Sequence, residues 1–93
     1  MGRNDMKVHL DGRLMTNKSA LHDHLQERFC FPGYYGRNLD ALYDLLTSLP
    51  EPTEVELHEK DILLHQLGTY GATFLVTLQQ AEDDAPNLTL NIF

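Results

Sequence analysis

The sequence has no tryptophan and only one cysteine, Cys30, among its 93 residues. A single cysteine cannot form an internal disulfide, so the cysteine usage gives no support to secretion. No apolar run is long enough to cross a bilayer, and residues 1–5 lack the apolar segment of a signal peptide. We therefore expect a cytoplasmic protein without membrane contact. Residues 1–5 either belong to the natural chain or form a poorly ordered extension before a start at Met6.

Basic residues are also scarce. The chain has 7 Lys and Arg against 14 Asp and Glu, which gives a formal net charge of −7. Nucleic-acid binding depends on Lys and Arg that neutralise phosphates, and here these residues are few and scattered. A negative field attracts basic proteins and speeds their encounter, although solubility alone also explains acidic chains. The charge predicts no nucleic-acid partner and favours a basic protein partner.

Motifs for catalysis or cofactor binding are missing. The sequence has no glycine-rich phosphate loop and no G-x-S-x-G elbow. Cys30 lies between two phenylalanines, which predicts a buried structural thiol rather than a nucleophile. His22 and His24 would point about 200° apart on a helix, and His58 with His65 lacks a third ligand. We predict no catalytic residue, no metal and no cofactor.

The chain is long enough for one domain with one core, residues 6–93. Alternating apolar and polar residues predict strands over 7–10, 53–57 and 87–93, and helical periodicity predicts helices over 19–29, 39–49, 59–67 and 70–82. Helical crossovers of this length allow parallel pairing. We expect an α/β fold, with a three-stranded parallel sheet packed with about four helices, mainly on one side.

Finer expectations concern the two helices of the first half. Ser19 is the predicted N-cap of the first helix, whose His22 and His24 should face water. Asn38 is the predicted N-cap of the second helix, and Gly36 is suited to a positive φ in the preceding loop. The prolines at 50 and 52 end the second helix, and either bond before them is compatible with a cis or trans state.

The second helix is strongly amphipathic. Five leucines fall on one side, at positions 39, 42, 45, 46 and 49. Asp40, Asp44, Thr47 and Ser48 fall on the opposite side, with Tyr43 at the boundary. This polar side stands next to the adjacent tyrosines of the preceding loop.

The two aspartates of this helix have different explanations. Asp40 lies in the first turn, where a carboxylate interacts favourably with the helix dipole by roughly 0.3–1 kcal/mol. Asp44 is a poor helix former in mid-helix, and its i−4 neighbour Asp40 carries a like charge that costs roughly 0.2–0.5 kcal/mol. Helix energetics therefore explain Asp40 but not Asp44, and an uncompensated residue of this kind indicates a functional site.

Two kinds of site can be built from these residues. Asp40 and Asp44 resemble an acid–base dyad of a small hydrolase, but an exposed helix face does not enclose and desolvate either carboxyl group as acid–base catalysis requires. Tyrosines beside carboxylates are typical of a protein interface. We expect one of Tyr34 and Tyr35 to pack under the loop, and we favour a protein-binding surface over an enzyme.

The segment Pro32-Gly33-Tyr34-Tyr35-Gly36-Arg37-Asn38-Leu39-Asp40-Ala41-Leu42-Tyr43-Asp44 resembles the P-x-Y-Y-G-x-N-L-D-A-L-[W/Y]-D signature of the barstar family. The resemblance extends over nearly the whole chain and includes Leu21-His22, Gly71-Ala72 and the last strand. Barstars are intracellular inhibitors of barnase-type ribonucleases. The resemblance implies a fold of three parallel strands and four helices, in agreement with the predicted order of elements.

The resemblance also implies a mechanism. In this family the loop and the second helix plug the active site of the ribonuclease, and one helix carboxylate occupies the place of an RNA phosphate. That carboxylate corresponds to Asp44. The resemblance assigns partner contacts to the loop, the second helix and one position of the long helix. They are Tyr34, Tyr35, Gly36, Asn38, Asp40, Tyr43, Asp44, Thr47, Ser48, Leu49 and Gln80.

Tyr43 stands where tryptophan is common, and the signature allows either residue. Three other positions depart from the family pattern: Ser48 stands where the best-known member has glycine, Leu49 replaces an aromatic residue, and Gln80 replaces an acid. We expect a monomer that inhibits a secreted basic ribonuclease or a related toxin, as an immunity protein does. The alternatives are a regulatory domain with a non-nuclease partner and, with less support, the small hydrolase.

Overall fold

The computed structural model describes residues 6–93 as three strands, four α-helices and one short 3-10 helix. The prediction that residues 1–5 form an extension lies outside this range. The strands are β1 (Met6–Asp11), β2 (Thr53–His58) and β3 (Leu88–Ile92), and the 3-10 helix spans Gly12–Leu14. The α-helices are α1 (Lys18–Phe29), α2 (Leu39–Thr47), α3 (Lys60–Leu67) and α4 (Thr69–Asp84).

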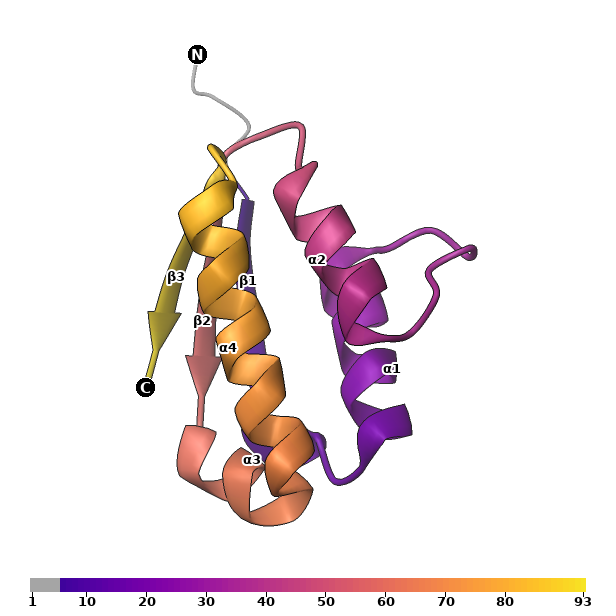
Figure 1. The fold of residues 1–93 in the computed structure, drawn as a ribbon, viewed down its shortest axis with the longest axis vertical. Helices are drawn as coiled ribbons and strands as arrows, with labels where there is room; N and C mark the ends of the chain where they lie inside the picture. Colours follow the sequence, from indigo (N-terminus) through magenta and orange to yellow (C-terminus); the bar gives the residue numbers. More distant parts are fainter. Residues whose placement is uncertain (1–5) are drawn as a thin grey trace.

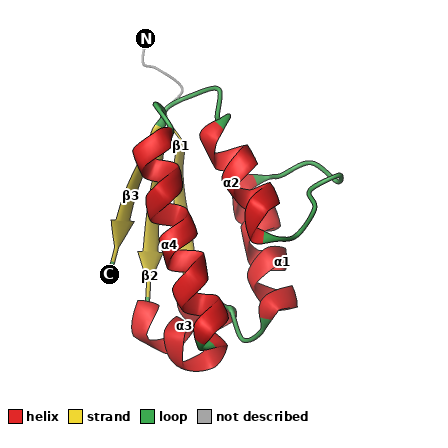
Figure 2. Ribbon diagram, viewed as in Figure 1, coloured by secondary structure: helices red, strands yellow, loops and turns green. Residues whose placement is uncertain are grey.

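The strands form one parallel sheet in the order β1-β2-β3. Val8 and Leu10 of β1 and Val55 and Leu57 of β2 are buried, whereas the residues between them face away from the core. The helices lie on one side of the sheet, and α4 runs along it (Figure 1). Figure 2 shows the same separation of helices from strands. The predicted α/β fold is confirmed.

Helix α4 has an inward row of Phe74, Leu78 and Ala81, which are at most 1% exposed. It packs against α2, α3 and β3 and thereby joins the two halves of the chain. Helix α3 ends at Gly68, as predicted, and this glycine has a φ of 57° that suits a residue without a Cβ. No α-helix of residues 6–93 is long and apolar enough to span a bilayer.

Two predictions about α1 are wrong. The helix begins one residue before Ser19, because Asn17 has an extended backbone and its Oδ1 accepts a 2.8 Å hydrogen bond from the amide of Ala20. His22 and His24 are buried rather than wet, 2% and 6% exposed. Their buried nitrogens are satisfied by hydrogen bonds, which helical periodicity does not reveal.

The prediction of a buried thiol is also wrong, because Cys30 is exposed. It follows α1 in the left-handed region, with φ 57° and ψ 43°, and its amide bonds back to the last turn of the helix. The flanking Phe29 and Phe31 stack with ring centroids 4.9 Å apart. Both aromatic rings therefore cover the core while the thiol between them points outward.

Candidate functional site

The candidate site consists of the loop 30–38 and helix α2, which we call the loop–α2 surface. Asn38 caps α2 as predicted, because its Oδ1 accepts a 2.7 Å hydrogen bond from the amide of Ala41. Its Nδ2 donates to the carbonyl of Gly36 at 3.2 Å, so the same side chain fixes the end of the loop and the start of the helix.

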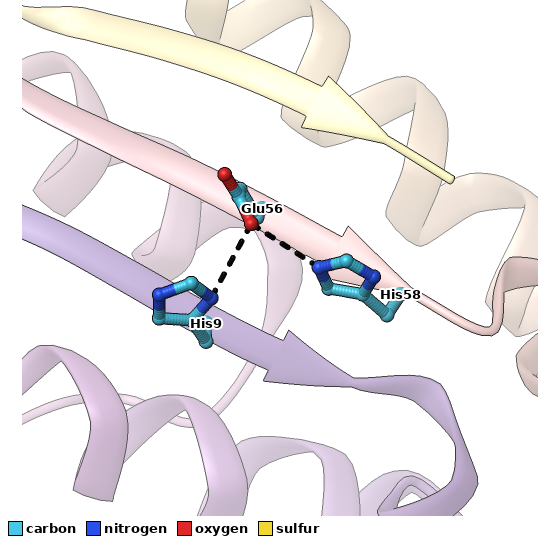
Figure 3. Close-up of side chains that lie close together, drawn as sticks. All are labelled: His9, Glu56 and His58. Atoms are coloured by element: carbon cyan, nitrogen blue, oxygen red, sulfur yellow. Dashed lines mark hydrogen bonds and ion pairs between the residues drawn. The ribbon is translucent and has the colours of Figure 1, made fainter.

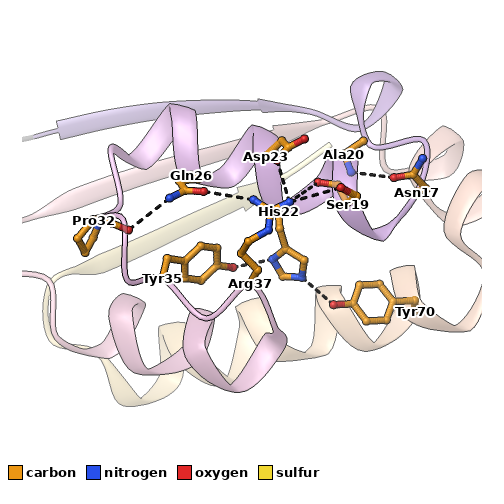
Figure 4. Close-up of polar contacts among 10 residues, drawn as sticks. All are labelled: Asn17, Ser19, Ala20, His22, Asp23, Gln26, Pro32, Tyr35, Arg37 and Tyr70. Atoms are coloured by element: carbon orange, nitrogen blue, oxygen red, sulfur yellow. Dashed lines mark hydrogen bonds and ion pairs between the residues drawn. The ribbon is translucent and has the colours of Figure 1, made fainter.

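The positive φ expected in this loop falls on Arg37, with φ 56°, and not on Gly36. Gly36 is instead needed for space, since a Cβ there would lie 3.2 Å from Ala41 Cβ and 3.3 Å from Asn38 Nδ2. Arg37 is held in this unfavourable conformation by its side chain. Its Nη2 lies 2.8 Å from Asp23 Oδ1 and donates to the carbonyl of Ser19 at 3.2 Å (Figure 4).

The adjacent tyrosines have opposite roles, which confirms that one of them packs under the loop. Tyr35 is 5% exposed and Tyr34 is 83% exposed. The Tyr35 hydroxyl lies 2.7 Å from His22 Nδ1, and His22 Nε2 lies 2.8 Å from the Tyr70 hydroxyl. Figure 4 shows His22 between the two rings, one from the loop and one from α4. This buried chain anchors the loop and leaves Tyr34 on the surface.

Burial is the main cause of the pKa shifts of His22, Tyr35 and Tyr70. It lowers the pKa of His22, with a smaller contribution from the positive charge of Arg37, because the core disfavours imidazolium. It also raises the pKa values of Tyr35 and Tyr70. The three groups are therefore neutral at physiological pH. A neutral imidazole donates one of its two hydrogen bonds and accepts the other.

Helix α2 presents its polar side to solvent as predicted. Leu42 and Leu46 are fully buried, and Asp40, Asp44 and Ser48 are exposed. Within residues 6–93 the carboxylates of Asp40 and Asp44 have no hydrogen bond or ion pair with another side chain or with the backbone. The part of the chain that the structure describes thus provides no internal partner for the charge of Asp44.

A shallow pocket of about 180 Å³ adjoins this carboxylate. It lies between the loop and α2 and is mostly apolar. Its lining residues are Tyr34, Tyr35, Gly36, Ala41, Asp44 and Leu45. An unpaired carboxylate at the edge of a small apolar pocket can receive a cationic or hydrogen-bond-donating group from another molecule.

The hydroxyl groups of α2 and of its C-cap are satisfied internally. The Ser48 hydroxyl donates to the carbonyl of Asp44 at 2.7 Å, and the Thr47 hydroxyl donates to that of Tyr43 at 2.9 Å. The Tyr43 hydroxyl donates to Asp84 at the end of α4, and this hydrogen bond is the main reason that the pKa of Tyr43 is raised. Unlike these hydroxyl groups, the carboxylates of Asp40 and Asp44 have no partner among residues 6–93.

The remaining predicted contact positions lie after α2 and on α4. The carbonyl of Leu49 accepts a 2.8 Å hydrogen bond from Asn87 Nδ2, which fixes the chain after α2. Within the described range no peptide bond is cis, so the bonds before Pro50 and Pro52 are trans. Gln80 is exposed on α4, the helix that packs beside α2.

Sequence reasoning missed the residues that hold the site in place. His22, Tyr70 and Arg37 were not assigned a role, because their partners are distant in sequence and periodicity carries no information about them. Asp84 was also missed. The acidic run Glu82-Asp83-Asp84 at the end of the long helix was the signal that could have found it.

The fold and the loop–α2 surface define a small α/β protein with an exposed acidic face. The exposed carboxylates have no enclosing walls of the kind that an acid–base dyad requires.

Comparison with known proteins identifies the class further. Residues 6–92 match the family model described as Barstar (barnase inhibitor), and the chain belongs to this family. It is 39% identical over 79 residues to a protein of Bacillus subtilis (strain 168) named "Putative ribonuclease inhibitor YrdF". The alignment covers 84% of this chain and 87% of that relative. The predicted family is confirmed, and a family of inhibitors agrees with the prediction that the chain is not an enzyme.

Proposed function

We propose that this protein inhibits a basic ribonuclease of the barnase type, or a related toxin, by placing the loop–α2 surface in its active site. Family membership supports the inhibitor role, and the observation that carries the mechanism is the unpaired carboxylate of Asp44. A nuclease active site contains cationic groups that bind phosphate. A fixed anion at the centre of a complementary surface competes for those groups.

The contact residues divide into two roles. Tyr34 offers a large exposed ring beside Asp44 and would supply contact area at little cost in conformational entropy. Tyr35 is buried, so we assign it to positioning the loop rather than to broad contact with the partner. Gly36 lets the loop approach α2 closely, and Asn38 fixes the connection between the loop and α2 through its two side-chain hydrogen bonds.

The outer contacts surround Asp44 along α2 and α4. Asp40 is exposed one turn before Asp44 and would add to the negative field that steers a basic partner. The hydrogen bond to Asp84 orients Tyr43. Asp84 also places an acidic group at the end of α4, the helix that carries Gln80. We assign the outer rim to these residues together with Thr47, Ser48 and Leu49.

The proposal includes the setting of the reaction. The target is a secreted basic enzyme, and the inhibitor is a cytoplasmic monomer that protects the cell before the nuclease is exported. The formal charge of −7 supports this assignment, because opposite charges accelerate association at low ionic strength.

Inhibition assays with a guanyl-preferring microbial ribonuclease test this mechanism. We expect Asp44→Asn to weaken inhibition by roughly 30- to 5,000-fold, because losing one member of a buried interfacial charge pair costs about 2–5 kcal/mol. Asp40→Asn should weaken it by less than about tenfold, mainly through slower association. Asp61→Asn is the matched control. It removes the same charge from α3, a helix that lies apart from the loop–α2 surface (Figure 1).

Two outcomes contradict the mechanism for that target. One is the absence of inhibition by the wild-type protein, and the other is equal inhibition by wild type and Asp44→Asn. If the protein does not inhibit the nuclease, co-purification from the native host separates a different nuclease from a non-nuclease partner. A captured protein without ribonuclease activity would replace the nuclease with the regulatory alternative.

A further inference from the structure

The second face of the sheet carries a side-chain cluster that the inhibitor role does not use. The parallel register pairs His9 of β1 with Glu56 of β2, and His58 follows Glu56 by two positions. Residues two apart on a strand point to the same face, so all three side chains stand on the side away from the helices. Figure 3 shows them together in front of the strands, with the helices behind.

Both imidazoles are directed at one oxygen of the carboxylate. Glu56 Oε1 lies 3.4 Å from His9 Nδ1 and 3.2 Å from His58 Nε2. In a tetrahedral zinc site, metal–ligand distances of about 2.1 Å separate neighbouring ligand atoms by roughly 3.4 Å. The two distances from Glu56 Oε1 to the imidazole nitrogens therefore already match the separation of ligand atoms around a shared metal ion.

The distance between the ligand nitrogens of the two imidazoles is longer, but rotation of the side chains can shorten it. The three ligand atoms lie within 4.8 Å of one another. The imidazole rings are roughly stacked, with centroids 6.4 Å apart, and the side chains of His9 and His58 are 57% and 46% exposed. Exposed side chains rotate at little cost, so the nitrogens can close on an ion without movement of the strands.

The neighbours of the cluster favour one orientation of each ligand. Phe93 stacks on His58 with ring centroids 4.8 Å apart, which restricts the imidazole plane. Lys7 Nζ lies 3.0 Å from Glu56 Oε2, the oxygen that does not face the histidines. The ammonium thus fixes the carboxylate and leaves Oε1 for a metal, although its positive charge opposes a cation nearby.

We propose that His9, Glu56 and His58 form a binding site for a divalent transition-metal ion such as Zn²⁺. Two imidazoles and one carboxylate are a donor set that zinc accepts, and three protein ligands leave one coordination position for water or another ligand. Ca²⁺ and Mg²⁺ prefer oxygen ligands in greater number and should not compete.

The site is independent of the loop–α2 surface. It lies on the strand face, whereas that surface is built on the helical side of the sheet (Figures 1 and 3). The protein should therefore bind the metal ion and its partner at the same time. Failure of ribonuclease inhibition would not affect the metal site, and absence of metal binding would not affect the inhibition mechanism.

Zinc titration of tag-free protein by isothermal calorimetry tests the proposal. We expect one Zn²⁺ per chain in the wild type. His9→Asn, Glu56→Gln and His58→Asn should each weaken binding at least roughly tenfold, since even the loss of an outer-shell partner costs 10- to 100-fold. His65→Asn removes an exposed histidine of α3 outside the cluster and should leave the affinity unchanged.

Two further measurements separate this site from general surface binding. Co²⁺ should give the visible absorption of a four-coordinate ion in the wild type and lose it in His58→Asn. Lys7→Gln should bind Zn²⁺ more tightly, because it removes the competing positive charge. The proposal is overturned if the wild type binds no Zn²⁺ at millimolar concentration, or if His65→Asn weakens binding as much as the cluster variants do.

Discussion

The hydroxyl of Tyr35 lies 2.7 Å from Nδ1 of His22 inside the core, and this contact joins the loop 30–38 to α1. The other imidazole nitrogen contacts Tyr70 of α4 at 2.8 Å. One buried side chain therefore connects the loop to two helices that are far apart in sequence. The exposed Tyr34 and Asp44 can be held in place for a partner because residues beneath them are fixed.

Tyr35→Phe tests this connection. The substitution keeps the ring and removes the hydroxyl, which leaves a buried imidazole nitrogen without a partner. Such a group costs about 1–3 kcal/mol, so we expect the free energy of unfolding in urea to fall by that amount. Tyr34→Phe removes the same hydroxyl from an exposed ring and should change stability by less than about 0.5 kcal/mol. Equal effects of the two substitutions would contradict the anchoring role.

Stability should decrease as the pH falls below the usual histidine pKa. Burial lowers the pKa of His22 and of His24, whose Nε2 accepts a 3.0 Å hydrogen bond from the amide of Asp11. In the unfolded chain these histidines bind protons near pH 6.5, their ordinary pKa, whereas in the folded chain they stay neutral at that pH. The contribution of these residues is thus complete above that pH and is lost as the pH falls toward their folded pKa values.

Urea unfolding from about pH 7.5 to about pH 5.5 measures this effect, because the range spans the ordinary histidine pKa. The carboxyl groups of Asp11 and Glu56 also have lowered pKa values. Their effect on stability changes only at lower pH, near and below their usual pKa values of 3.8 and 4.5. His24→Gln should reduce the slope of stability against pH, and His65→Gln on the surface should not. A wild-type stability that rises on acidification would contradict the assignment.

Arg37 offers a test of backbone strain against side-chain contacts. Its φ of 56° is costly for a residue with a Cβ, and its guanidinium bonds Asp23 and Ser19. Both Arg37→Ala and Arg37→Gly lose these contacts, but only glycine relieves the strain. We expect Arg37→Gly to be more stable than Arg37→Ala by about 1 kcal/mol in thermal or urea unfolding. The reverse order would show that the left-handed conformation is not retained.

Two glycines differ sharply in the space around them. A Cβ at Gly12 would lie 2.9 Å from Leu63 Cβ and closer still to the carbonyl of Glu59, whereas one at Gly33 would have no neighbour within 4 Å. Gly12→Ala should therefore destabilise the fold by about 1–3 kcal/mol through overpacking between the 3-10 helix and α3. Gly33→Ala should change the urea midpoint little, and a comparable loss in both variants would contradict this explanation.

The sequence was sufficient for the architecture because its apolar residues follow the strand and helix periods closely. The three strands, the four helices and the cap at Asn38 depend on residues near in sequence, and each was predicted. The contact role of Asp44 was inferred in the same way, from the absence of any local compensation. That role stays a prediction until a partner is tested.

The errors have a common physical origin. His22 and His24 were expected to face water because a polar residue on a helix is normally solvated, yet tertiary partners satisfy both. Spacing along one element also carries no information about the cluster of His9, Glu56 and His58. The sheet instead brings His58 beside His9 from another strand, and strand register is not encoded in local spacing.

Asp44→Ala should make the free protein more stable while it weakens inhibition. Asp44 lies in the last turn of α2, where the helix dipole disfavours a carboxylate, and Asp40 repels it from the preceding turn. Alanine removes both costs, improves helix propensity and loses no side-chain hydrogen bond, so the expected gain is about 1 kcal/mol. Asp40→Ala is the matched control, because it removes a carboxylate that the first turn favours and should not stabilise the protein comparably. Urea unfolding measures both variants, and a loss of stability in Asp44→Ala would mean that its carboxylate has a structural partner after all.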